Sequence, residues 1–126
     1  MNMFSDALSL ASSGLKAQGQ RLLHVSENIS NADTPGYRRK IVHFEAAGAK
    51  GHVEAGDISL DRSELKKIFD PSHPLADADG NYNGSNVDLM IEVADAREAQ
   101  RSYEANLKMF DQARQMSSSL MDLLRR

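Results

Sequence analysis

Histidine, cysteine and serine are the side chains with which a small protein most often does chemistry, and their spacing here is unpromising. The four histidines form neither an HExxH nor an HxxxH pair: His24, His43, His52 and His73. The absence of cysteine excludes disulfides, thiolate metal sites and a cysteine nucleophile. No GxSxG, phosphate-loop or GxGxxG motif occurs, and the serines at 117–119 are typical of a solvated helix face. The sequence predicts a protein that is not an enzyme and holds no cofactor.

A calcium loop is the nearest match to a metal site, in the stretch DADGNYNGSNVD. Asp77, Asp79 and Asn81 occupy positions 1, 3 and 5 of such a loop, and Asp88 occupies position 12. Position 6, however, is Tyr82 where glycine is required, and position 12 is Asp where a bidentate Glu is required. We therefore favour a turn-rich loop without metal. Calcium binding stays as the alternative, which a calcium titration of the melting temperature would test.

The charge of the chain is small and evenly spread. Its 126 residues carry a net charge of −3, with −1 in each of the ranges 1–34, 35–85 and 86–126. No segment therefore has the positive field that a nucleic-acid site needs. The N-terminus has an acid, Asp6, and no basic region before its apolar residues, unlike a Sec-type signal peptide. No apolar run approaches the roughly 18 residues of a membrane span. We expect no nucleic-acid partner and no small-molecule substrate.

A coiled-coil-like spacing runs through the N-terminal part of the chain. Positions on one helix face recur in alternating steps of four and three, with one polar member: Phe4, Leu8, Ala11, Leu15, Gln18, Leu22, Val25 and Ile29. Gly14 and Gly19 each weaken a helix by about 1 kcal/mol relative to alanine. The spacing predicts a helix over residues 3–30 that depends on a partner for stability.

The C-terminal third repeats this spacing. Its stripe consists of Leu89, Val93, Ala96, Gln100, Tyr103, Leu107 and Phe110, and is roughly continued by Ala113, Leu120 and Leu124. Neither glycine nor proline occurs after Gly84, which predicts one long helix over residues 86–124. Ser85 or Asn86 is the expected N-cap, with Asp88 in the first turn at the positive end of the helix dipole.

Between the helices the composition changes. The runs KIVHFEA, GHVEAGDISL and ELKKIF predict two or three short strands, and the stretch DPSHPLADADGNYNGSN predicts an irregular loop. A helix of about 38 residues spans roughly 57 Å, longer than the roughly 36 Å diameter of a compact domain of this size. We expect a mainly α fold with a small β insertion (α+β), built on an elongated antiparallel pair of terminal helices. Its segments would be 1–34, 35–85 and 86–126, and its leftover apolar positions favour an assembly subunit.

The stretch SENISNADTPGYRRK joins the first helix to the insertion. Asn28 and Asn31 can hydrogen-bond backbone that leaves the helix, while Thr34-Pro35-Gly36 favours a turn. Tyr37 can pack back on the helices, and the cations that follow can meet acidic neighbours. A simple helix stop and a shared interface element both fit these residues.

The same residues resemble a known family. ENISNADTPGYRR is similar to the signature of bacterial flagellar axial proteins of the rod and hook class, and NVDLMIEVADAREAQRSYEANLKMFDQARQM resembles the closing helix of that family. The loop DPSHPLADADG and the short length resemble a proximal rod protein in particular. The match covers both ends and the loop before the closing helix, and residues 46–66 resemble nothing specific.

The resemblance implies a structural subunit of the flagellar basal-body proximal rod, which transmits motor torque for motility. Implied partners are copies of itself, other rod proteins of the FlgB, FlgF, FlgG and FliE types, and the flagellar type III export apparatus. It also implies export without a cleaved signal peptide and a place in the periplasmic rod. The alternatives are another rod or hook protein, such as FlgB, and a secreted helical adaptor. The expected interface residues are Leu8, Leu15, Leu22, Asn28, Ile29, Asn31, Thr34, Pro35, Gly36, Tyr37, Arg38, Asn86, Val87, Asp88, Glu92, Val93, Arg101, Tyr103, Asn106, Leu107 and Phe110.

Overall fold

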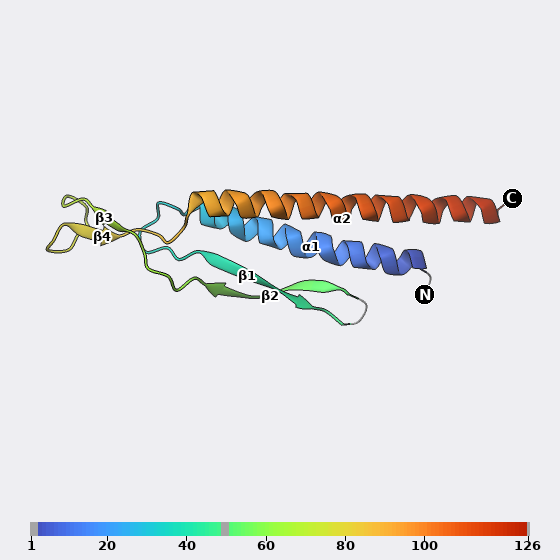
Figure 1. Ribbon diagram of the computed structural model, residues 1–126, viewed down its shortest axis with the longest axis horizontal. Coiled ribbons are helices and arrows are strands. Elements are labelled where there is room, and N and C mark those ends of the chain that lie inside the picture. The colour runs from blue at the N-terminus through green and yellow to red at the C-terminus, as the bar shows by residue number, and fades with distance from the viewer. Residues whose placement is uncertain (1–2, 49–50, 126) are drawn as a thin grey trace.

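Two long helices and a small β insertion make up the computed structural model, which describes residues 3–48 and 51–125 (Figure 1). In chain order the elements are α1 (Met3–Ser30), β1 (Lys40–Ala46), β2 (Val53–Leu60), β3 (Lys67–Phe69), β4 (Asn81–Asn83) and α2 (Leu89–Leu124). The helices lie side by side and antiparallel, so the molecule is elongated and both termini lie toward one end. The predicted fold class is confirmed.

The segments 1–34, 35–85 and 86–126 include residues 1–2, 49–50 and 126, which lie outside the described residues. Within the described ranges, neither helix combines the length and the apolar character needed to cross a membrane.

The first helix has the expected bounds, whereas the second begins with a different cap. It starts at Leu89 instead of residue 86, and Asp88 is its N-cap. The Asp88 backbone is extended (φ −105°, ψ 110°), and its carboxylate accepts a hydrogen bond of 3.0 Å from the Met90 N–H. The expected cap at Ser85 or Asn86 is therefore wrong. Both side chains bind other segments of the chain, which the isolated cap preference does not reveal.

Small side chains let α1 and α2 approach closely. The buried apolar or small residues of the two helices are Ala11, Gly14, Ala17, Val25, Ala99 and Ala113. The expected leucines of α1 (Leu8, Leu15 and Leu22) are half-buried, and Ile29 is exposed. Because alanine and glycine leave little side chain between two backbones, the larger leucines lie at the flanks of the contact.

On α2 the expected stripe is wrong by about one residue. Val93 and Leu107 are each 42% exposed, and Gln100 is exposed as well. The buried line passes instead through Glu92 and Ala99, and it meets the expected stripe at Ala113, which is buried as predicted. Tyr103 and Phe110 are half-buried and belong to both lines. Val93 and Leu107 misled the prediction because they lie on a second apolar face of α2, which this chain leaves open.

Gly14 on α1 lies against the side chain of Asn106 on α2, and it gives a test of the packing. A Cβ atom at Gly14 would lie 2.6 Å from Oδ1 of Asn106, whereas one at Gly19 would have nothing nearer than 3.9 Å, in Tyr103. We expect Gly14→Val to lower the free energy of unfolding by about 1–3 kcal/mol through overpacking. Gly19→Val is the matched control, because it makes the same change on the same helix. Equal melting temperatures of the two variants by circular dichroism would contradict the close contact.

The insertion contains two separate antiparallel pairs. β1 and β2 pair from Lys40 opposite Leu60 to Ala46 opposite Val53, with an irregularity between Val42 and Phe44. This hairpin runs along α1, as Figure 1 shows. Its position places the start of β1 beside the C-terminal turn of α1.

The second pair, β3 and β4, projects beyond the ends of the helices (Figure 1). Lys67 pairs with Asn83 and Phe69 with Asn81. The expectation that the whole stretch before α2 is irregular was therefore wrong, because residues 81–83 form β4. The expected strand ELKKIF is reduced to Lys67–Phe69. Three-residue strands leave no recognisable alternation, so the partner strand was not predictable from its own sequence.

Candidate functional site: the joint between helices and strands

The last turn of α1 contains a buried asparagine, Asn28, which forms hydrogen bonds to Tyr37, to the start of β1 and to α2. The Asn28 Oδ1 atom accepts hydrogen bonds from the Tyr37 hydroxyl and from the Lys40 N–H, each at 2.8 Å. Its Nδ2 atom donates to the Lys40 carbonyl at 3.0 Å and to Oε2 of Glu92 at 3.3 Å. A carboxamide has two donor hydrogens and two acceptor lone pairs, and here all four are used. Asn28 therefore ties α1 to β1 and to α2.

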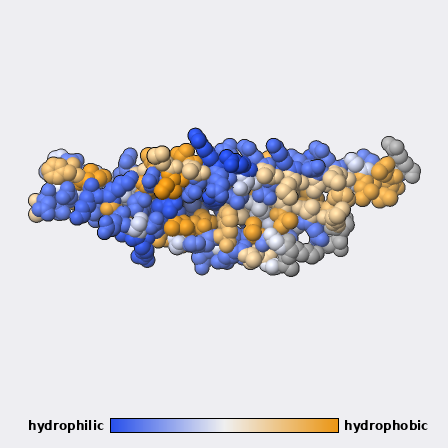
Figure 2. Space-filling view, viewed as in Figure 1, coloured by the Kyte–Doolittle hydropathy of each residue, from blue (hydrophilic) through white to orange (hydrophobic). Residues whose placement is uncertain are grey.

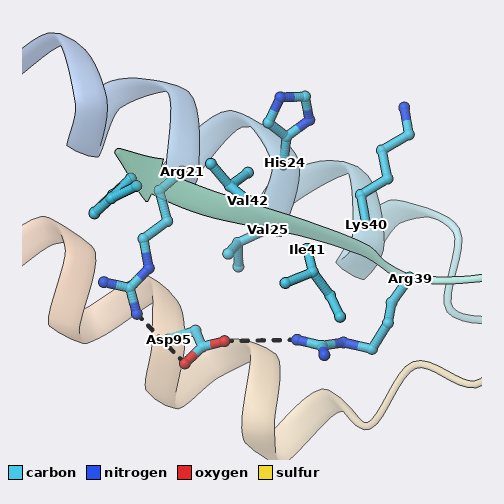
Figure 3. Close-up of a pocket in the computed structure, with 9 residues that line it drawn as sticks. Arg21, His24, Val25, Arg39, Lys40, Ile41, Val42 and Asp95 are labelled. Atoms are coloured by element: carbon cyan, nitrogen blue, oxygen red, sulfur yellow. Dashed lines mark ion pairs between the residues drawn. The ribbon is translucent and has the colours of Figure 1, made fainter. Parts of the chain in front are cut away.

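Glu92, on the first turn of α2, is fully buried at 0% exposure. Its Oε1 atom accepts a hydrogen bond from Nε of Arg39 at 2.5 Å. The guanidinium of Arg39 also lies 3.4 Å from Asp61 and 3.6 Å from Asp95. Figure 3 shows Asp95 between Arg39 and Arg21, which lies 3.5 Å from Asp95. Burial of the Glu92 charge is thus compensated by a cation from the segment that precedes β1.

The turn after α1 is held by its own polar side chains. The Asn31 Nδ2 atom donates to the Glu27 carbonyl at 2.8 Å, and the Thr34 hydroxyl donates to Oδ1 of Asn31 at 3.1 Å. Gly36 has φ of +76°, a conformation that favours glycine, and its N–H donates to the carbonyl of Asn83 at 3.2 Å. The turn is therefore bound to the end of β4.

The segment that leads into α2 crosses the same region. The Asn86 Oδ1 atom accepts from the Arg39 N–H at 2.7 Å, and its Nδ2 atom donates to the Asp61 carbonyl at 2.9 Å. Val87 is fully buried, and Nζ of Lys66 donates to its carbonyl at 2.7 Å. We call the assembly of Asn28, Tyr37, Arg39, Lys40, Asp61, Asn86 and Glu92 the joint.

The charged groups around the joint have shifted pKa values. The hydrogen bond from Lys40 lowers the pKa of Glu27, and the same contact, 2.6 Å long, raises the pKa of Lys40. The pKa of Asp61 is lowered by hydrogen bonds from the backbone and hydroxyl of Ser63, and then by Arg39. Burial raises the pKa of Tyr37, which favours the neutral phenol that donates to Asn28. At neutral pH each group is held in the form that its partners require.

These shifts predict how stability depends on pH. The pKa values of Glu27 and Asp61 are lowered from the ordinary 4.5 and 3.8, so their stabilisation is complete above those values. It is lost as the pH falls through the lower values of the folded state. We expect the melting temperature to be insensitive to these groups near neutral pH and to fall below about pH 4. In the Glu27→Gln variant the melting temperature should fall less steeply below about pH 4. If the pH dependence of the melting temperature were unchanged in that variant, the Glu27–Lys40 pair would not contribute to stability.

The structure brings some of the expected interface residues together and leaves others apart. Asn28, Tyr37, Asn86 and Glu92 meet at the joint, and Val87 is buried next to Asn86. Other members of the predicted set lie elsewhere: Thr34, Pro35 and Gly36 in the exposed turn, Arg38 on the carbonyls of residues 61 and 63, and Arg101 exposed on α2. Tyr103 and Asn106 face α1. Contacts of these residues with neighbouring subunits stay a prediction.

Sequence reasoning missed Arg39, Lys40 and Asp61 as site residues. The run of three cations after Tyr37 was a signal for Arg39 and Lys40, because such cations were expected to meet acidic neighbours. In the structure Arg39 pairs with Glu92 and Lys40 with Glu27. Nothing in the sequence marks Asp61, whose role depends on the pairing of β1 with β2.

The polar groups of the joint are used in contacts within the chain. They bind one another, and among residues 3–48 and 51–125 no three metal-binding side chains lie close enough to hold a metal ion. In the former calcium candidate, Oδ1 of Asp77 accepts from the N–H groups of Asp79 and Asn81. That carboxylate stabilises a turn, as the favoured interpretation expects.

Comparisons with known proteins point to one class. A family model described as "Flagella basal body rod protein" matches residues 8–38, and one described as "Flagellar basal body rod FlgEFG protein C-terminal" matches residues 78–123. These ranges contain Asn28 and Glu92, whereas Arg39 lies just outside them. A relative from Agrobacterium fabrum is 42% identical, over 99% of this chain and 98% of that protein. The chain therefore belongs to the family of flagellar basal-body rod proteins.

The relatives narrow this class further, because each is a flagellar basal-body rod protein FlgC. Besides the Agrobacterium fabrum protein, they include FlgC of Salmonella typhimurium, 32% identical over 90% of this chain and 92% of that protein. FlgC of Bacillus subtilis is 29% identical over 93% of this chain and 95% of that protein. The chain is thus a member of the FlgC group of rod proteins. The resemblance read from the sequence is confirmed, and the FlgB and adaptor alternatives lose their support.

Proposed function

We propose that this chain is a non-catalytic structural subunit of the proximal rod, and that the joint keeps it stiff while the rod transmits torque. The observation that carries the proposal is the saturated network of Asn28, Glu92 and Arg39, which locks α1, α2 and β1 to one another. A buried network in which every member is bonded resists rearrangement, because each change of angle leaves a polar group without a partner.

The proposed partners are copies of the chain and other rod proteins of the FlgB, FlgF, FlgG and FliE types. The flagellar type III apparatus would export it without a cleaved signal, and its place would be the periplasmic part of the rod. Exposed apolar side chains on α2 support an assembly role: Leu89, Met90, Ile91, Val93 and Leu107. A surface of this kind is typical of a protein that is covered by neighbours.

Gly36 offers a direct test of the joint in the assembled rod. Gly36 and Gly48 have φ of +76° and +72°, and a Cβ at either position would have nothing within 4 Å. Valine at both therefore introduces the same backbone strain, of order 1–3 kcal/mol, without a clash. We expect Gly36→Val to abolish motility at normal protein levels and Gly48→Val to preserve it, because Gly48 lies in the hairpin turn away from the joint.

The readouts are swimming in soft agar and the amount of the chain in cell extracts. Normal motility of the Gly36→Val strain would contradict the joint as a required element. Equal loss in both strains would show that backbone strain anywhere in the insertion is enough.

A further inference from the structure

The β1–β2 hairpin lies across α1 and is bound to it by helix side chains near both of its ends. Near the joint, the N–H and the carbonyl of Lys40 both bond to the carboxamide of Asn28. At the opposite end, the Val53 N–H donates to Oγ of Ser13 at 3.4 Å. Asn28 thus holds the edge of β1 and Ser13 the edge of β2, and Figure 1 shows the two strands crossing between these points.

A bulge divides this hairpin in two. In β2 two residues, Gly56 and Asp57, lie opposite His43 of β1, whereas the residues on either side pair one to one. A bulge of this kind interrupts the ladder of hydrogen bonds and bends the strand that contains it. The two parts are the inner half, residues 40–42 with 58–60, and the outer half, residues 44–46 with 53–55.

The inner half is fixed by the buried groups of the joint. Asn28 and Glu92 are 1% and 0% exposed. Arg39, which directly precedes β1, donates to Glu92 and lies 3.4 Å from Asp61. A cavity of about 230 Å³ borders this half (Figure 3), but movement of the strand would leave the buried Glu92 charge without its cation. The joint therefore opposes any displacement of the inner half.

The outer half lies on α1 through weaker contacts. Nε2 of His52 is 2.9 Å from Oγ of Ser9 in an exposed contact, and the bond from Val53 to Ser13 is long. A cavity of about 330 Å³ lies between this half and α1, and its apolar walls on the hairpin side are small: Ala47, Val53 and Ala55. Atoms that line a void lose dispersion contacts on one side. Figure 2 shows hydrophilic patches among the apolar ones along the hairpin side of the molecule, so water reaches this side.

We propose that the outer half is a flap, which swings away from α1 about the bulge while the inner half stays in the joint. The two strands remain paired with each other during this movement. Local openings that break few buried contacts have free energies well below that of global unfolding. The open flap uncovers Ala17 of α1, which is 1% exposed in the closed form and lines the cavity. This conformational change goes beyond the structural role proposed above and does not depend on it.

Thiol reactivity of the purified chain tests the flap, because the chain has no cysteine of its own. Ala17→Cys places a thiol under the flap, and Ala99→Cys places one in the contact between the helices, where Ala99 is 0% exposed. The reagent is a maleimide coupled to polyethylene glycol, which is too bulky for the cavity. We expect the thiol at position 17 to react at least about 100-fold faster than the thiol at position 99, which is reached only when the helices separate. Ala113→Cys, also buried on α2, is a second control for the case in which Ala99→Cys does not fold.

A further variant tests the contact that closes the flap. Ser13→Ala removes the acceptor of the Val53 N–H, so it should speed the reaction at position 17 and leave the reaction at position 99 unchanged. Ser12→Ala, at an exposed position of the same helix, should change neither rate. Equal rates at positions 17 and 99 in the unaltered background would overturn the flap.

Hydrogen exchange distinguishes a swinging flap from strands that come apart. The Ala47 N–H donates to the His52 carbonyl, and ladder bonds recur at every second residue, so the Glu45 N–H also faces β2. We expect the Glu45 amide to exchange more slowly than the thiol at position 17 reacts. Exchange at the rate of labelling would show that β1 and β2 separate, which also overturns the flap. Each of these results leaves the proposed place of the chain in the rod untouched.

Discussion

Replacing Arg39 with methionine is expected to lower the free energy of unfolding by about 3–5 kcal/mol, because it leaves a buried charge without its partner. The carboxylate of Glu92 has no exposure to water, and Arg39 supplies its short hydrogen bond of 2.5 Å. Asp61 and Asp95 lose the same cation. Urea unfolding of the purified chain, followed by circular dichroism, measures the change.

Two further variants show whether the buried pair is the cause. Arg114→Met makes the same substitution in a surface pair, where Asp111 lies 3.9 Å away, and we expect a loss below about 1 kcal/mol. Arg39→Met combined with Glu92→Leu removes both charges and should recover part of the loss, because an apolar replacement leaves no buried charge. Equal effects of Arg39→Met and Arg114→Met would contradict the importance of the pair.

The second large effect is expected at Asn28. Asn28→Leu leaves the Tyr37 hydroxyl, the Lys40 backbone and one oxygen of Glu92 without their partner. An unsatisfied buried polar group costs about 1–3 kcal/mol, and we expect a total loss of about 2–4 kcal/mol, since some of these groups can reach water. The same urea unfolding measurement applies.

Graded variants make the Asn28 result specific. Tyr37→Phe removes one of the four hydrogen bonds and should cost about 1 kcal/mol. Gln20→Leu, at an exposed position of the same helix, should change stability by less than about 0.5 kcal/mol. A loss at Asn28 no larger than that at Tyr37 would mean that the network acts through a single bond.

The helices were predictable because their signal is local and long. Alternating steps of four and three over many turns identify a helix face, and the bounds of α1 followed from it. The face of α2 was harder to predict, since Val93 and Leu107 form a second apolar line beside the buried one. Periodicity alone does not say which of two apolar lines meets the partner helix within the same chain.

The joint was predictable only in part, for a similar reason. Asn28 was predicted from its place at the end of the first helix to bind backbone that leaves the helix, and it binds the Lys40 backbone. Glu92 was named only through the resemblance to rod and hook proteins. Arg39 and Asp61 act through contacts with residues far along the chain, which only the fold brings near. The predicted N-cap of α2 was wrong for the same reason, because the Asn86 side chain binds backbone of the β insertion and not of its own helix.

In the role proposed above, the polar joint stiffens a chain whose core is thin. The buried residues of its helix contact are mainly alanine and glycine, which bury little apolar surface. The polar joint adds directional bonds at the place where both helices meet the β insertion. Burial of this network is compatible with a subunit whose remaining apolar faces are completed by its neighbours.

Electron microscopy of cell envelopes from the source bacterium lacking this chain tests the central claim most directly. The account predicts that hooks and filaments are lost while the ring in the membrane remains, and that the natural gene restores them. It further predicts that a gene carrying Arg39→Met does not restore them, whereas Arg114→Met does. Intact flagella in the strain without the chain would contradict the proposed place of this protein in the rod.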